Sequence, residues 1–177
     1  TQDITHLVDF KKQLLLWSQQ FREVTFMDSN QYQQEYSTYD WILAVDAFTS
    51  IKTDYFNAFE DLKQYQQSSR DWLFGYLAYD LKNDAEVLHS NNFDGLGFPD
   101  LFFYQPKKLF LAKGNQLEIR YLHFCDDEFE EDWKEILSIV TDFETLSPNI
   151  EIQQRISAEA YHEKVNKMLE YIHHGDL

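Results

Sequence analysis

The sequence WLFGYLAY, residues 72–79, has apolar side chains at both alternating positions of a strand. This pattern predicts a central β-strand that is covered on each side, because only such a strand buries both of its faces. Gly75 lies inside the stretch and indicates either a bulge or a close approach of another backbone or a ligand. The polar residues 79–84 that follow could hold a ligand, or they could end the strand in an ordinary turn.

Helices are expected before and after this strand in the sequence, where apolar residues recur at helical spacing. The second helix should begin at Thr53 or Asp54, and the last should be capped by Ser157 and ended by Gly175. The four apolar stripes are Phe10, Leu14, Trp17 and Phe21; Phe56, Phe59 and Leu62; Trp133, Ile136, Leu137 and Val140; and Tyr161, Val165, Leu169 and Ile172.

Short apolar runs between turn signals predict further strands. Pro106 and Gly114-Asn115 are the turn signals, and the second of these indicates a hairpin. The expected strands are 24–27, 41–45, 101–104, 109–112, 117–121 and 150–153. Strands in runs interrupted by helices favour an α+β fold, with mostly antiparallel sheets packed with helices.

Composition limits the classes of partner. The chain has 177 residues, enough for one domain or one domain with an appendage, and 17% of them are aromatic. Its 31 acidic and 15 basic residues give a net charge of −16, which repels nucleic acid and anionic membranes. No basic leader and no apolar run of about 18 residues is present, and one cysteine excludes an internal disulfide. We therefore expect a soluble, cytoplasmic protein that binds neither nucleic acid nor membranes.

No catalytic residue and no metal ligand is predicted from motifs alone. The acidic run 126–132 precedes a helical stripe, so its carboxylates are expected in a first helical turn, where the helix dipole favours them. His173 and His174 point about 100° apart on a helix and cannot clamp one ion without help. Cys125 and His123 would share a face of a strand, but no acid that could complete a catalytic dyad is identifiable.

Three segments taken together resemble the chorismate-utilising large subunits, a family that includes aminodeoxychorismate synthase and anthranilate synthase. Their order and spacing suit the family across nearly the whole chain, and the second segment is the most specific. The segments are 26–30 with 36–44; 72–83 with Glu86, 97–103 and Pro106; and Ser157 with Tyr161, Val165, Ile172, Gly175 and Asp176.

The resemblance implies a domain division and an activity. Residues 1–155 would form the N-terminal α+β domain of the chorismate-utilising fold, and residues 156–177 the first helix of the catalytic domain. The parent enzyme would use Mg²⁺, chorismate and ammonia from a glutamine amidotransferase subunit. Residues 80–83 look more like the aminodeoxychorismate branch, which leads to 4-aminobenzoate and folate, than like the anthranilate branch, which leads to tryptophan. The catalytic half and its magnesium ligands would lie outside these 177 residues, so this piece alone is expected to be inactive.

The resemblance also implies a ligand pocket, because some members bind tryptophan in this half. A carboxylate and hydroxyl groups can hold an α-ammonium group, and tyrosine rings can bracket an indole. The tyrosines could equally fill the core, and the chain could also be a stand-alone tryptophan-binding module or an acidic interaction domain without a ligand. The matching residues are Asp28, Ser29, Tyr36, Ser37, Tyr39 and Asp40.

Overall fold

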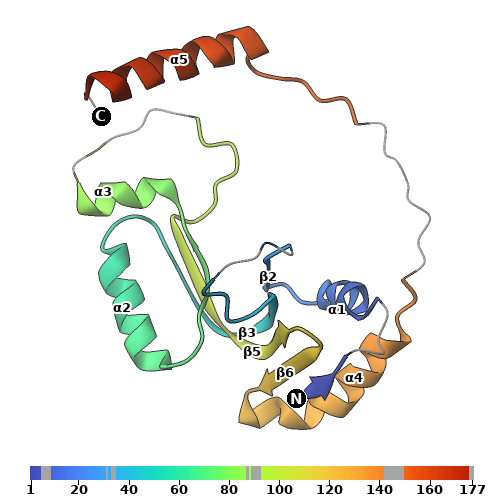
Figure 1. Cartoon of the computed structure of the whole chain (residues 1–177). Coiled ribbons are helices and arrows are strands. Elements are labelled where there is room, and N and C mark those ends of the chain that lie inside the picture. The colour runs from blue at the N-terminus through green and yellow to red at the C-terminus, as the bar shows by residue number, and fades with distance from the viewer. Residues whose placement is uncertain are drawn as a thin grey trace. The chain divides into compact units, whose positions relative to one another are not determined.

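The computed structural model describes residues 1–4, 9–30, 32, 35–86, 88, 93–141 and 150–175 (Figure 1). In chain order the elements are β1 (Gln2–Asp3), α1 (Phe10–Ser18), β2 (Val24–Asp28), β3 (Trp41–Thr53), α2 (Ala58–Ser69), β4 (Phe74–Leu77), η1 (Tyr79–Leu81), α3 (Lys82–Ala85), β5 (Leu101–Lys113), β6 (Gln116–Tyr121), η2 (His123–Glu128), α4 (Phe129–Ser138) and α5 (Ala158–His174). Strands and helices alternate irregularly, which confirms the α+β class.

The strands form one antiparallel sheet in the described part of the chain. Its order is β1-β6-β5-β3-β2, and β4 pairs with the first part of β5. The long strands β3 and β5 pair over almost their whole length and form the centre of the sheet. The expected hairpin is present, since β5 and β6 pair in register across the turn at Gly114.

Helices α1 and α4 pack side by side against one face of the sheet near β6 (Figure 1). Their apolar stripes meet β3 and β5 in a core where Leu14, Leu43, Phe110 and Ile136 are at most 1% exposed. Burying each of these side chains contributes roughly 1.5–3 kcal/mol. The helical periodicity in the sequence therefore arises from this shared core.

Helix α2 packs near the other end of β3 and β5 (Figure 1). It begins after Asn57, because β3 extends to Thr53 and occupies the position where the cap was expected. Asp84, 27 residues downstream of Asn57, accepts hydrogen bonds from the backbone N–H groups of Asn57 and Phe59. This carboxylate satisfies two donors of the first helical turn, so the N-terminal cap comes from a distant part of the chain.

The expectation of a central, doubly covered strand at residues 72–79 is wrong. The strand β4 is only four residues long, exposes Gly75, Tyr76 and Leu77, and among the described strands pairs only with β5. The prediction of a close approach at Gly75 is confirmed, since a Cβ atom there would lie 1.9 Å from the carbonyl oxygen of Phe102. The aromatic residues of β4 pack on their neighbours in β5 rather than under a covering layer.

Residues 101–113 form one strand where two were expected. Pro106 does not make a turn, because it lies opposite the irregularity between Ala47 and Thr49, where β3 carries an extra residue. A proline is tolerated in a sheet at such a bulge, since its missing N–H group leaves no broken ladder bond there.

The remaining expectations are partly confirmed. Helix α5 is capped as expected: the Oγ atom of Ser157 accepts from the N–H of Ala160 at its start, and Gly175, with φ 77°, follows its last residue. Phe21 and Val140 lie beyond the ends of their helices, and residues 150–153 are not a strand. The acidic run does supply Glu130, Glu131 and Asp132 to the first turn of α4.

The chain divides into two compact units, residues 1–141 and 142–177. The first unit contains the sheet and helices α1–α4, and α5 belongs to the second. None of the helices in the described ranges is long and apolar enough to cross a membrane.

Candidate functional site

The structure brings three of the six predicted ligand residues together at the base of the β2–β3 connection. Asp28 ends β2 and pairs in register with Trp41, while the N–H of Ser29 donates to the carbonyl oxygen of Asp40 at 2.9 Å. The backbones of these three residues are therefore adjacent, but side chains alternate along paired strands, so the side chain of Asp28 lies on the opposite face from those of Ser29 and Asp40.

Both carboxylates of this group already have partners. Asp28 forms an ion pair with Lys11 of α1 and accepts from the N–H of Asn30 at 3.0 Å. The hydrogen bond from Lys11 holds the pKa of Asp28 below its usual value, and the Asn30 bond adds to this effect. The Oδ2 atom of Asp40 accepts from the N–H of Gly114 at 2.6 Å and so secures the β5–β6 turn. In this geometry both acids support local structure.

The other three predicted residues do not converge on one point. Tyr36 is 87% exposed, whereas Tyr39 is half-buried and packs edge-on against Trp72, with ring centroids 6.3 Å apart. Ser37 donates to the carbonyl oxygen of Tyr39 at 2.8 Å. The tryptophan pocket built from all six residues stays a prediction.

The polar segment 79–84 forms the short helices η1 and α3. Lys82 pairs with Asp80 at 2.6 Å and lies 4.8 Å from the ring centroid of Tyr79. Asp84 caps α2 as described above. These contacts give the segment a structural role at the end of β4.

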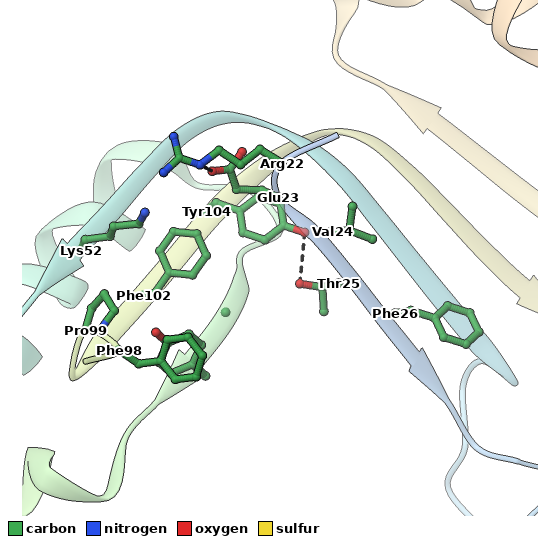
Figure 2. Close-up of a pocket in the computed structure, with 12 residues that line it drawn as sticks. Arg22, Glu23, Val24, Thr25, Phe26, Lys52, Phe98, Pro99, Phe102 and Tyr104 are labelled. Atoms are coloured by element: carbon green, nitrogen blue, oxygen red, sulfur yellow. Dashed lines mark hydrogen bonds and ion pairs between the residues drawn. The ribbon is translucent and has the colours of Figure 1, made fainter. Parts of the chain in front are cut away.

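A hollow of about 660 Å³ lies between β2, β4 and β5, and none of the six predicted residues lines it (Figure 2). The ring centroid of Phe102 lies 5.8 Å from that of Tyr104, in a stacked arrangement, and 6.0 Å from that of Tyr76. The ring of Tyr76 in turn lies 6.2 Å from that of Phe98. The hollow is lined by Arg22, Glu23, Val24, Thr25, Phe26, Lys52, Gly75, Tyr76, Phe98, Pro99, Phe102 and Tyr104. It is a concave surface with five aromatic side chains and four polar or charged ones, and small-molecule sites commonly combine apolar walls with a few polar groups.

Tyr104 is the buried wall of the hollow. Its ring reaches past β3, and its hydroxyl donates either to the carbonyl oxygen of Ala44 at 2.9 Å or to Oγ1 of Thr25 at 3.1 Å (Figure 2). Burial raises the pKa of Tyr104 to about 12. The phenol therefore stays neutral at physiological pH, and its hydrogen bonds hold the ring in place along the hollow.

Two cations border the hollow, and they differ in their partners. Arg22 forms an ion pair with Glu23 at 3.5 Å. The Nζ atom of Lys52 lies 4.9 Å from the ring centroid of Phe102, and no carboxylate among the described residues pairs with it. Figure 2 shows Lys52 on one side of the Phe102 and Tyr104 rings and Thr25 on the other. Lys52 is thus the uncompensated positive charge of this surface.

Other candidate groups do not form a reactive centre. Cys125 lies in η2 rather than in a strand; its thiol is buried and donates to the carbonyl oxygen of Leu122, and burial raises its pKa. His123 pairs with Asp126 at 2.9 Å and is fully exposed. Within the described ranges, no group of three or more His, Cys, Asp or Glu side chains could hold a metal ion.

The hollow does not follow from local sequence patterns, because it depends on the full length of β3. The expected strand ended at residue 45, whereas β3 continues to Thr53 and pairs Lys52 with Phe102. Thr25 and Tyr104 are 79 positions apart and meet only through the strand order. The one signal present in the sequence was the density of aromatic residues between 72 and 104.

These features define an antiparallel α+β domain with a concave, largely apolar surface on its sheet. The sequence matches the family described as chorismate binding enzyme over residues 12–177, and the chain belongs to this family. A comparison with curated proteins found no match.

Proposed function

We propose that the chain is the N-terminal portion of aminodeoxychorismate synthase component I. The parent enzyme would replace the C4 hydroxyl group of chorismate with an amino group, using ammonia from a glutamine amidotransferase subunit, on the way to 4-aminobenzoate and folate. Membership of the chorismate-binding family supports the substrate class. The observation that carries the finer proposal is the segment 72–83, whose sequence resembles this branch of the family most closely.

The same resemblance suggests separate roles for two parts of the chain. Residues 1–155 would act as the non-catalytic α+β domain, and residues 156–177 would open the catalytic domain. The proposal assigns chorismate binding and Mg²⁺ to that catalytic domain, outside the residues described here. The described chain contributes the sheet, the helix-covered core and the α5 helix with its exposed apolar side chains, among them Tyr161, Leu169 and Ile172.

The product that the parent enzyme forms from chorismate distinguishes the aminodeoxychorismate branch of the family from the anthranilate branch. The native-length gene product, supplied with chorismate, ammonia and Mg²⁺, is expected to form 4-amino-4-deoxychorismate, identified by chromatography and mass. Residues 1–177 alone are expected to form no product under the same conditions. Anthranilate as the product would keep the family and assign the protein instead to tryptophan biosynthesis, as an anthranilate synthase component I.

A stand-alone tryptophan-binding module is the second candidate. The observation that favours it is that the backbones of Asp28, Ser29 and Asp40 are adjacent where β2 meets β3. A ligand that binds only the folded state raises the melting temperature by mass action. A saturable rise with L-tryptophan, absent with L-alanine, would support this candidate, and an unchanged melting temperature would exclude it.

A further inference from the structure

We propose that the hollow between β2, β4 and β5 binds a small planar aromatic carboxylate, with Lys52 as the partner of the carboxylate group. This site is separate from the six residues of the expected tryptophan pocket, and it does not depend on which product the parent enzyme makes. The proposal is based on the position of Lys52, the walls of the hollow and the charge of the chain.

The position of Lys52 points to an anion. The chain has 31 acidic and 15 basic residues, so an exposed ammonium group has many carboxylates available to it. Lys11, Lys63, Lys82, Lys107 and Lys108 each pair with one, whereas exposed lysines such as Lys12 pair with none in the described ranges, so what distinguishes Lys52 is its position. Lys52 instead lies over the face of Phe102 at the border of the hollow. A carboxylate at this border would complete a charge-assisted interaction that the described chain leaves open.

The walls of the hollow point to a planar ring. Phe102 and Tyr104 are stacked with an interplanar angle of 21°, while Tyr76 meets Phe102 at 56°. These surfaces can hold a ligand ring in stacked and edge-on contacts, which are the arrangements that aromatic pairs prefer. Phe98, 67% exposed at the mouth, can cover the ring from the open side.

The polar groups set the orientation of the ligand. Thr25 and the hydroxyl of Tyr104 lie on the side away from Lys52 (Figure 2). A substituent that can hydrogen-bond, at the end of the ring opposite the carboxylate, would reach Oγ1 of Thr25 while the carboxylate meets Lys52. The volume of about 660 Å³ lies within the roughly 300–1,000 Å³ of typical small-molecule sites, so a single aromatic ring fits.

The test uses residues 1–177 and a pair of probes that differ only in charge. 4-Aminobenzoate is expected to bind in isothermal titration calorimetry, and 4-aminobenzamide, which lacks the carboxylate, is expected to bind about fivefold more weakly or not at all. Amide chemical-shift changes in ¹H–¹⁵N spectra should centre on residues 24–26, 52, 75–76 and 102–104.

Variants separate the charge of Lys52 from the fold. Lys52→Met keeps the aliphatic stem and should weaken 4-aminobenzoate binding about fivefold without changing amide binding, and Lys52→Arg should restore it. Lys12→Met, on an exposed part of α1 outside the hollow, is the matched control and should leave the affinity unchanged. Melting temperatures within about 2 °C of the parent would verify that each variant is folded.

Three results would overturn the proposal: no binding of 4-aminobenzoate, equal binding of acid and amide, or an affinity that Lys52→Met leaves unchanged. Shift changes confined to residues 28–29 and 36–40 would also overturn it and would support the predicted tryptophan pocket. Because this experiment measures binding without turnover, its failure leaves the proposed function untouched, and a different product of the parent enzyme leaves this proposal untouched.

Discussion

Lys108 is the residue whose surroundings constrain the packing most. Its side chain is 3% exposed, and its Nζ atom lies 2.5 Å from Oδ2 of Asp132 and 2.8 Å from Oε2 of Glu128. Trp17, Phe21 and Tyr121 place their rings within 5.5 Å of the ammonium group. Burial alone would lower the pKa of Lys108, but hydrogen bonds to Asp132 and Glu128 outweigh it and raise this pKa overall. The group therefore stays charged and ties β5 to α4.

Replacing Lys108 by Met is expected to lower the free energy of unfolding by about 3 kcal/mol, because Asp132 would be left buried without its cation. The control is Lys107→Met at the neighbouring position, where the side chains of Lys107 and its partner Asp46 are 28–29% exposed. Losing this pair should lower the free energy of unfolding by about 1 kcal/mol or less. The double variant Lys108→Met/Asp132→Asn should recover part of the loss. Urea unfolding curves measure all three; equal losses for Lys107→Met and Lys108→Met would contradict the argument.

At the scale of elements, the attachment of β4 to β5 depends on one glycine. The carbonyl oxygen of Phe102 and the Cα of Phe103 would lie 1.9 and 2.6 Å from any Cβ at position 75. These are backbone atoms within the strand pairing, so they cannot move aside without breaking it. An ordinary side chain at this position is incompatible with the observed register.

Gly75→Ala is therefore expected to detach β4 and to destabilise the fold by about 2–4 kcal/mol, since the clash is with backbone. Leu77→Ala is the control, because Leu77 is 51% exposed on the same strand and its loss should cost less than about 1 kcal/mol. Hydrogen exchange should show faster exchange of the β4 amides and of the β5 amides around 101–104 in the glycine variant only. Unchanged protection of these amides would contradict the predicted detachment.

The elements also show what the sequence could predict. The helices α1, α4 and α5 and the β5–β6 hairpin follow from local periodicity, so they were predicted correctly, apart from Phe21 and Val140, which lie beyond the ends of their helices. The length of β3, the unbroken β5 and the edge position of β4 depend on strand pairing, which local patterns do not contain. For the same reason the pairs Thr25–Tyr104, Asp84–Asn57 and Lys108–Asp132 could not be foreseen, since each joins residues 24 to 79 positions apart.

At the scale of the whole molecule, the net charge of −16 on 177 residues affects the stability of the fold. Most acidic side chains are exposed, so like charges are brought close together when the chain folds. Such self-repulsion destabilises the compact state, and salt screens it over a Debye length of about 10 Å at 0.1 M. The buried Lys108 pairs are screened much less, because little solvent reaches them.

Raising NaCl from about 10 mM to about 0.5 M at pH 7.5 should therefore raise the melting temperature by roughly 2–4 °C, a shift that corresponds to about 1 kcal/mol for a chain of this size. KCl should act equally, because screening depends on ionic strength rather than on a specific ion. The Lys108→Met variant should gain the same amount, since its lost pair lies out of reach of the salt. A melting temperature that falls with salt would mean that exposed ion pairs such as Lys11–Asp28 outweigh the repulsion, and the charge argument would then fail for this fold.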